Sequence, residues 1–151
     1  MAKGDFNFFS KIRVRWAEVD KQGIVFNAHY LAYFDIGVTD YYRAIGYPYL
    51  GPFPQTGTDL YLKSAKVEYH ASAGFDDVID LGIRVSRIGN SSFEFRCEIY
   101  KGDIILTSGE LVYVNADAET LIPATLPEFL EDAFVKFEKL PPVKRSRSRS
   151  T

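Results

Sequence analysis

One long stretch of helical periodicity, set among segments that alternate with a period of two, most constrains how this chain can fold. From Ala28 onward, apolar residues recur at steps of three and four: Tyr30 or Leu31, Phe34, Val38, Tyr41 and Ile45. This spacing predicts a helix of about four turns with a wide apolar face. Gly46, followed by Pro48, predicts where that helix ends.

Alternation of apolar and polar side chains predicts strands on both sides of this helix. A first strand is expected over residues 8–19, where Ile12, Val14 and Trp16 alternate with Arg13 and Arg15. Further strands are expected over residues 59–71, 79–86, 93–99 and 105–114, with a tight hairpin signal at Lys101-Gly-Asp103. Apolar residues between Pro123 and Leu140 predict a short closing helix. This order indicates an α+β fold, an antiparallel sheet that carries one central helix.

The length of 151 residues suits one domain with its own core. Hydrophobic residues make up 46% of the chain and charged residues 25%, as in a soluble globular protein. We expect a single domain over residues 1–140. Residues 141–151, which end in the run RSRSRST, are expected to form a basic, disordered tail because that run has no apolar side chain to bury.

Charge and motif content exclude several classes of function. The net charge is −2, but without the four basic residues of the segment 144–151, 14 basic residues face 20 acidic ones, a net charge of −6. So acidic a body disfavours nucleic-acid binding. One cysteine and two histidines predict neither disulfides nor a metal site. There is no nucleotide phosphate loop, signal peptide or membrane-spanning stretch, so we expect a cytoplasmic protein without membrane association.

The stretch DKQGIVFNAHY, residues 20–30, combines an acid, a glycine turn and the start of the predicted helix. Asp20 ends a strand, Gly23 allows a tight turn, and Asn27 opens the helix, where unpaired N–H groups carry partial positive charge. A carboxylate facing that point can attack a thioester or ester, or activate water, while the N–H groups stabilise the oxyanion. Taken alone, D-x-x-G before a helix favours a structural turn, because Asp and Gly are common turn residues and Asn caps helices.

The segment VRWAEVDKQGIVFNAHYLAYFDIGVTDYYRAIG resembles the opening signature of the hot-dog-fold acyl-CoA thioesterases related to 4-hydroxybenzoyl-CoA thioesterase. Two later segments, SRIGNSSFEF and VYVNADAETLIPATLPEFL, also resemble parts of that family, so the resemblance reaches to about Leu140. The residues that match the opening signature are Asp20, Gly23, Val25, Phe26, Asn27, Tyr30, Phe34 and Asp35.

The resemblance implies a hot-dog fold, in which a curved antiparallel sheet of about five strands wraps round one long helix. It also implies a dimer or tetramer with active sites between subunits, and hydrolysis of acyl-CoA to a free acid and CoA without metal or cofactor. Asp20 corresponds to the family's catalytic acid, as nucleophile or general base, and a backbone N–H near Asn27 corresponds to the oxyanion donor. Further candidate substrate contacts near this site are Gly23, Val25, Phe26, His29 and Tyr30.

Other candidate residues concern the CoA moiety. Arg84, Arg87 and Ser91 are candidates for contacts with its phosphates, since anions need guanidinium or hydroxyl donors. The acidic body favours CoA over an acidic carrier protein. Two departures from the family pattern stand out. Part of the family has His at the position of Asn27, which cannot act as a base and so would cap or orient, and many relatives have Arg at the position of Val38.

Three alternatives to a thioesterase remain at this point. A hot-dog hydratase or dehydratase would resemble D-x-N-P-x-H, whereas DKQGIV has neither that Asn nor that His. A non-catalytic acyl-CoA-binding regulator would lack a usable acid and would normally carry a DNA-binding segment. A purely structural module is the third alternative. The preferred acyl group stays open, because the aromatic loop Tyr47–Phe53 suits either a ring or a chain.

Overall fold

The computed structural model describes residues 3–48 and 51–144. None of the helices within these ranges is long and apolar enough to cross a membrane. The elements follow one another in the order η1 (Lys3–Asp5), β1 (Phe8–Arg13), η2 (Trp16–Glu18), α1 (His29–Ala44), β2 (Thr58–Tyr69), β3 (Val78–Ile88), β4 (Ser92–Lys101), β5 (Ile104–Asp117), α2 (Glu128–Phe137) and β6 (Val143–Lys144).

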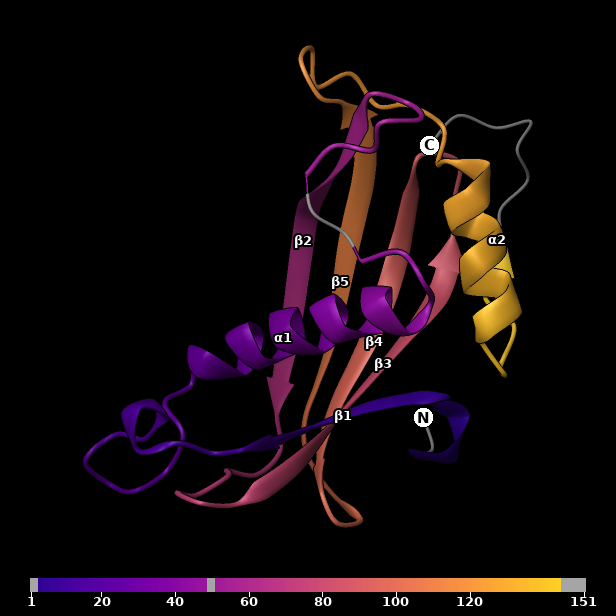
Figure 1. Ribbon diagram of the computed structural model, residues 1–151. Helices are drawn as coiled ribbons and strands as arrows, with labels where there is room; N and C mark the ends of the chain where they lie inside the picture. Colours follow the sequence, from indigo (N-terminus) through magenta and orange to yellow (C-terminus); the bar gives the residue numbers. More distant parts are fainter. Residues whose placement is uncertain (1–2, 49–50, 145–151) are drawn as a thin grey trace.

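The five long strands form one antiparallel sheet in the order β1-β3-β4-β5-β2 (Figure 1). The sheet curves around α1, as the α+β prediction requires, and α2 lies beside the β3–β4 side. The 12-residue strand β2 pairs with β5 along one side, and no other strand of the described residues pairs with its opposite edge. This open edge is long enough to bind another strand.

The end of the chain differs from the expected boundary. A tail was predicted from residue 141, but Val143 and Lys144 form the short strand β6, which pairs in parallel with Arg87 and Ile88 of β3. Lys144 also lies 3.3 Å from Glu131 of α2 in an ion pair. Residues 145–151 of the predicted tail lie outside the described residues.

The first strand is shorter than its hydrophobic alternation predicted. It was expected over residues 8–19, but β1 ends at Arg13, and a 3-10 turn follows at Trp16–Glu18. Arg13 pairs with Val78, the first residue of β3, and pairing with the segment just before β3 continues only to Val14, whose N–H donates to the Asp77 carbonyl at 2.8 Å. Glu18 accepts hydrogen bonds from Arg15, which favour the turn over continued strand.

Helix α1 packs against the concave face of the sheet, and two glycines make that contact close. A Cβ on Gly109 of β5 would lie 2.5 Å from the ring of Phe34, and a Cβ on Gly37 would lie 2.9 Å from Ile83. The buried face of α1 includes Tyr30 rather than Leu31, which is 40% exposed. The core beneath this helix contains most of the strand residues predicted to face inward, among them Ile79, Leu81, Ile83, Val85, Phe93, Phe95, Cys97 and Ile99.

The sequence predicted the capping of α1 at its C-terminal end, but not at its N-terminal end. Gly46 has φ +87°, the Gly46 N–H donates to the Arg43 carbonyl, and the Tyr47 N–H donates to the Tyr42 carbonyl. This is the pair of bonds of a Schellman cap, so the predicted end is confirmed. At the start, Ala28 holds the capping position, and no side chain caps the helix. Of the two roles expected for the Asn27 side chain, to cap or to orient, capping is therefore not observed.

Candidate active site

Asp20 begins a tight hairpin that projects from the N-terminal end of α1. The Asp20 N–H donates to the Ile24 carbonyl and the Gly23 N–H donates to the Asp20 carbonyl, both at 2.9 Å. Val19 and Val25 pair as a bridge beneath the turn. Gly23 has φ +79°, a conformation that L side chains rarely adopt, so glycine is required for this three-residue loop.

Only one carboxylate oxygen of Asp20 accepts a hydrogen bond within the turn. Its Oδ1 accepts a hydrogen bond of 2.8 Å from the Gln22 backbone N–H, the arrangement of an Asx turn. Its Oδ2 has no hydrogen-bond partner among the described residues, and the side chain is half-buried. One carboxylate oxygen therefore stabilises the turn, as the structural interpretation requires, and the other is left without a protein donor among the described residues.

The segment that leads from the hairpin into α1 presents unpaired donors. The His29 N–H donates to the Phe26 carbonyl at 2.9 Å, and the Tyr30 N–H donates to the Asn27 carbonyl at 3.3 Å. In the described part of the chain, the N–H groups of Asn27 and Ala28 have no hydrogen-bond partner. They lie at the positive end of a 16-residue helix, where a developing negative charge is stabilised.

The hairpin is docked on the connection between β2 and β3. The Val25 N–H donates to the Ala73 carbonyl at 2.9 Å, and Ile24 pairs with Gly74. The Tyr30 hydroxyl in turn accepts the Ala73 N–H at 3.0 Å, which ties this connection to α1. The Tyr69 hydroxyl of β2 donates to the Asn27 carbonyl at 3.0 Å. These contacts hold the hairpin and the helix start in one relative position.

Glu18, at the base of the hairpin, is the most heavily bonded side chain of this region. It is 6% exposed; Oε1 accepts the Arg15 N–H at 2.8 Å and the Tyr33 hydroxyl at 2.9 Å, and Oε2 accepts two bonds from the Arg15 guanidinium. Burial acts to raise the pKa of Glu18, but these hydrogen bonds outweigh it and hold the pKa below its ordinary value. Both oxygens are occupied, so Glu18 is not available as a base.

An apolar hollow of about 400 Å³ lies beside the start of α1, between this helix and strands β2 and β5. Asp35 is its one charged side chain, and its other lining residues are Ala28, Leu31, Ala32, Leu62, Leu111 and Tyr113. Leu31 and Leu62 are 40% and 48% exposed, so the hollow is open to solvent beside these two side chains. It suits an acyl group, because small-molecule sites are concave and mostly apolar.

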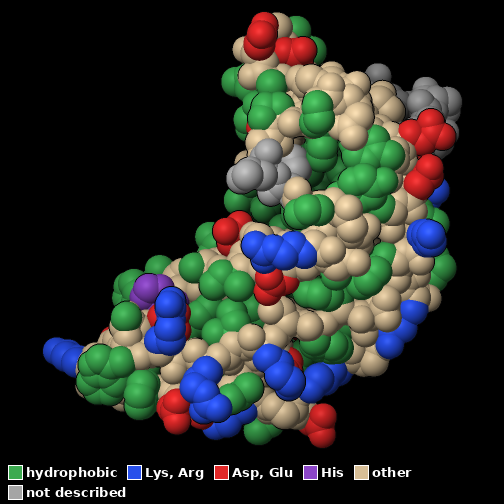
Figure 2. Space-filling model, viewed as in Figure 1, with side chains coloured by type: hydrophobic (Ala, Val, Ile, Leu, Met, Phe, Trp, Pro, Cys, Tyr) green, Lys and Arg blue, Asp and Glu red, His purple; other side chains and the backbone are tan. Residues whose placement is uncertain are grey.

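Exposed aromatic side chains surround the hairpin. Trp16 is 72% exposed and packs edge-on against Phe75 at 5.1 Å, while Phe26 is 53% exposed and lies 6.0 Å from the half-buried ring of His29. Figure 2 shows hydrophobic and basic side chains together on this projecting lobe. Val25 and Tyr30 are buried beneath it, each 1% exposed.

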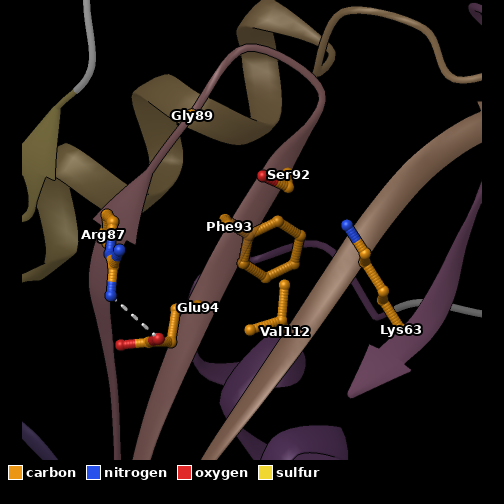
Figure 3. Close-up of a pocket in the computed structure, with 7 residues that line it drawn as sticks. All are labelled: Lys63, Arg87, Gly89, Ser92, Phe93, Glu94 and Val112. Atoms are coloured by element: carbon orange, nitrogen blue, oxygen red, sulfur yellow. Dashed lines mark hydrogen bonds and ion pairs between the residues drawn. The ribbon is translucent and has the colours of Figure 1, made fainter. Parts of the chain in front are cut away.

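A smaller pocket of about 210 Å³ lies towards the other end of the sheet, near the β3–β4 turn (Figure 3). Lys63 and Arg87 lie on either side of Phe93 and Val112, and Ser92 lies near the turn. Arg87 forms an ion pair of 3.2 Å with Glu94. The remaining lining residue is Gly89.

The structure brings together only part of the predicted phosphate-binding set. Arg87 lines this pocket, whereas Arg84 and Ser91 do not, and each of those two is 6% exposed. The Arg84 guanidinium donates to the Leu140 carbonyl at 3.4 Å, beneath the C-terminal segment. Lys63 and Ser92 were missed by sequence reasoning, because only the pairing of β2, β5 and β4 brings them beside Arg87.

The Glu18 cluster was also missed as part of the candidate site, although the sequence carries a signal for it. Arg15 and Glu18 are three residues apart, a spacing that allows the side chain to bond back to the backbone at the start of a helical turn. Nothing in the sequence indicates the third partner, Tyr33, which α1 supplies. Within residues 3–48 and 51–144, no group of three or more His, Cys, Asp or Glu side chains could hold a metal ion.

A helix wrapped by a curved antiparallel sheet, with an acid-bearing hairpin at the helix start, defines a hot-dog protein. Residues 14–134 match the family model of the thioesterase-like superfamily, and the chain belongs to that superfamily.

Individual relatives agree with this assignment. The chain is 22% identical over 130 residues to the acyl-CoA thioesterase YbgC of Haemophilus influenzae, covering 86% of this chain and 96% of that protein. The solved structure of the Pseudomonas aeruginosa protein PA5185 is similar with a TM-score of 0.76 at 27% identity, covering 90% of this chain and 94% of that one. The Synechocystis protein Slr0204, a 1,4-dihydroxy-2-naphthoyl-CoA thioesterase, has a TM-score of 0.77 at 18% identity, covering 84% and 94%. The hot-dog fold expected from the sequence is confirmed.

Proposed function

We propose that this protein hydrolyses an acyl-CoA thioester to a carboxylic acid and CoA. One observation carries the proposal: the Asp20 hairpin, with Oδ2 unpartnered, leads directly into a helix start whose Asn27 and Ala28 N–H groups are also unpartnered among the described residues. An acid and an oxyanion site joined by a short, rigid segment are the two elements that acyl transfer to water requires. The similarity to acyl-CoA thioesterases supports the same chemistry.

Two routes are compatible with this arrangement. As a general base, Asp20 takes a proton from water, and the water oxygen attacks the thioester carbonyl carbon. The C–S bond then breaks, and the proton passes to the CoA thiolate. As a nucleophile, Oδ2 attacks the carbonyl carbon itself and expels the thiolate, and water then hydrolyses the acyl-aspartyl anhydride. In both routes the Asn27 and Ala28 N–H groups bind the oxyanion, and Asn27 contributes through its backbone rather than as a base.

The acyl group is proposed to occupy the apolar hollow along α1, with its thioester carbonyl towards Ala28. Substrate contacts near the carbonyl would come from the hairpin and helix start, namely Gly23, Val25, Phe26, His29 and Tyr30. Among these, Val25 and Tyr30 are buried and would shape the site from beneath, whereas Phe26 is exposed and can contact the substrate directly.

We propose further that the working unit is a dimer or a tetramer built from dimers. The segment between β1 and α1, which contains the Asp20 hairpin, and the turn between β3 and β4 lie towards opposite ends of one subunit (Figure 1), and the Lys63–Arg87 pocket lies near that turn (Figure 3). If the open β2 edges of two subunits pair antiparallel, the hairpin of one subunit comes to the end of the sheet that carries the other's pocket. Lys63 and Arg87 can then bind the phosphates of a CoA whose thioester lies at Asp20 of the partner.

The specific observation that favours a non-catalytic acyl-CoA-binding protein is the Asx turn, because it accounts for Asp20 without chemistry. A panel of short-chain, long-chain and aromatic acyl-CoA esters, assayed by thiol release, separates the two functions. Turnover of at least one ester at catalytic enzyme concentration is expected. Stoichiometric binding of acyl-CoA without release of thiol from any ester would establish the binding protein instead.

A further inference from the structure

We propose that Glu18 is a positioning residue that sets the location of Asp20 relative to the start of α1. The inference rests on the proposed function, since it assigns Glu18 a role in that same reaction. Glu18 lies two residues before Asp20, is 6% exposed, and has both carboxylate oxygens occupied by protein donors. It therefore cannot take a proton from water, and it acts through the residues it holds.

The contacts of Glu18 reach three separate parts of the site. Through Oε1 and Oε2 its carboxylate binds the backbone and guanidinium of Arg15, which fixes the chain where it leaves β1. The Tyr33 hydroxyl, which donates to Oε1 at 2.9 Å, lies one turn into α1. The Glu18 backbone carbonyl accepts the Phe26 N–H at 3.1 Å, on the far arm of the hairpin.

These contacts link the acid to the oxyanion site. The hairpin arm from Glu18 to Asp20 carries the acid, and the arm that ends at Phe26 continues into Asn27 and Ala28. Glu18 holds both arms and anchors them to Tyr33 of the same helix whose N-terminus binds the oxyanion. Movement of Glu18 would thus change the distance between the carboxylate of Asp20 and the two N–H groups. Misplacement of a catalytic group by about 1 Å can reduce the rate by about 10²-fold.

The chain contains a matched control in Glu138. It is 7% exposed, and its Oε2 accepts the hydroxyl of another α1 tyrosine, Tyr41, at 2.5 Å, together with the Val85 N–H at 3.0 Å. It differs from Glu18 in location, since it lies at the C-terminal end of α2 against β3, away from the hairpin. Glu138→Gln therefore reproduces the loss of a buried, tyrosine-bonded carboxylate without touching the site.

The test measures steady-state kinetics and amide exchange on the full chain. Glu18→Gln keeps an oxygen that can accept from Tyr33 but cannot retain all three Arg15 bonds, so we expect kcat to fall by about 10²-fold with little change in KM. Exchange of the Asp20, Gly23 and Phe26 amides should accelerate in this variant. Glu138→Gln should leave kcat and these three amides unchanged. Equal losses of kcat in the two variants would assign Glu18 a purely structural role.

A double-variant experiment shows whether Glu18 acts through Asp20. In an Asp20→Asn background, Glu18→Gln should reduce the residual rate no further, because the group it positions is already gone. A further loss of the same size would overturn the proposal. If Asp20→Asn alone keeps full turnover, Asp20 is not the catalytic acid and Glu18 cannot act through it, while the exchange measurement still decides whether Glu18 holds the hairpin; absence of turnover of every ester by the wild type would instead refute the proposed function. Should Glu18→Gln fail to fold, Tyr33→Phe with Tyr41→Phe as its control gives the same comparison.

Discussion

Oδ1 of Asp20 accepts a hydrogen bond of 2.8 Å from the Gln22 backbone N–H, while Oδ2 has no partner among the described residues. The Asp20→Asn variant therefore separates the two roles of this side chain, because the amide oxygen can still accept the hydrogen bond of the turn while the negative charge is lost. We expect turnover to fall by about 10²–10⁴-fold. The melting temperature should hardly change, and acyl-CoA should still bind by calorimetry. Near-normal thiol release would remove Asp20 from the mechanism and leave Asp35, in the apolar hollow, as the acid to examine.

Lys63→Gln and Arg87→Gln should each raise the KM for acyl-CoA by about tenfold or more, because a well-formed hydrogen bond to a charged group contributes about 1.5–3 kcal/mol and each 1.4 kcal/mol is about a factor of ten. Turnover at saturation should stay the same, since these side chains would contact the CoA phosphates and not the thioester at Asp20. Added salt should reduce the difference from the wild type. Arg43→Gln, which removes an exposed arginine paired with Asp40, is the matched control and should leave KM unchanged. Equal KM values in all three variants would refute the phosphate site.

The open edge of β2 predicts self-association. Light scattering should give an even multiple of the subunit mass of 17.1 kDa. The exposed Leu62 on this strand should lie at the contact between subunits, so Leu62→Lys should shift the mass towards the monomer and lower activity together. An active monomer would contradict a site that depends on two subunits.

The two buried glutamates should give pH dependences of opposite sign. Burial raises the pKa of Glu138 above its ordinary value of 4.5, against the opposing hydrogen bonds of Tyr41 and Val85 and the charge of Arg84. Since the folded state then holds its proton more tightly, the contribution of Glu138 to stability falls as the pH rises above about 4.5. The pKa of Glu18 is lowered, so its contribution is present above about 4.5 and is lost as the pH falls through its folded-state value.

Denaturant unfolding between about pH 3 and pH 7 tests this pair. Relative to Glu138→Gln, the wild type should lose stability as the pH rises through that range. Relative to Glu18→Gln, it should gain stability over the lower part of the range. If the stability difference between wild type and variant changed with pH in the same direction for both glutamates, then burial would not dominate at Glu138 and hydrogen bonding would not dominate at Glu18.

Gly109→Ala should destabilise the fold by about 1–3 kcal/mol, because a new Cβ would lie 2.5 Å from the Phe34 ring and 2.7 Å from the Lys66 carbonyl. The backbone carbonyl cannot move aside cheaply. Gly4→Ala, where nothing lies within 4 Å of the added Cβ, is the control and should leave the urea midpoint unchanged. A neutral Gly109→Ala would mean that α1 is free to shift on the sheet.

Hydrophobic period alone sufficed to predict α1, the four strands that follow it and the closing helix. The interior of α1 is buried at Phe34, Val38 and Tyr41, as its spacing of three and four residues requires. The hairpin at Gly102 and the helix end at Gly46 followed from glycine, which adopts the positive φ that both positions need. The family signature around Asp20 led to the fold that the comparisons confirm. These features are local, so neighbouring residues specify them.

Features that depend on residues far apart in the sequence could not be predicted. The strand expected over residues 8–19 ends at Arg13, because Glu18 is held by Arg15 and by Tyr33 of the helix. Lys63, Arg87 and Ser92 meet only through strand pairing, while Arg84, on the same strand as Arg87, is buried beneath the C-terminal segment. The sequence by itself determined which segments are helix or strand and where the acid-bearing turn lies, since periodicity and turn chemistry act over a few residues. Only the tertiary structure decided which side chains share a site, because burial and distance depend on how the sheet folds around α1.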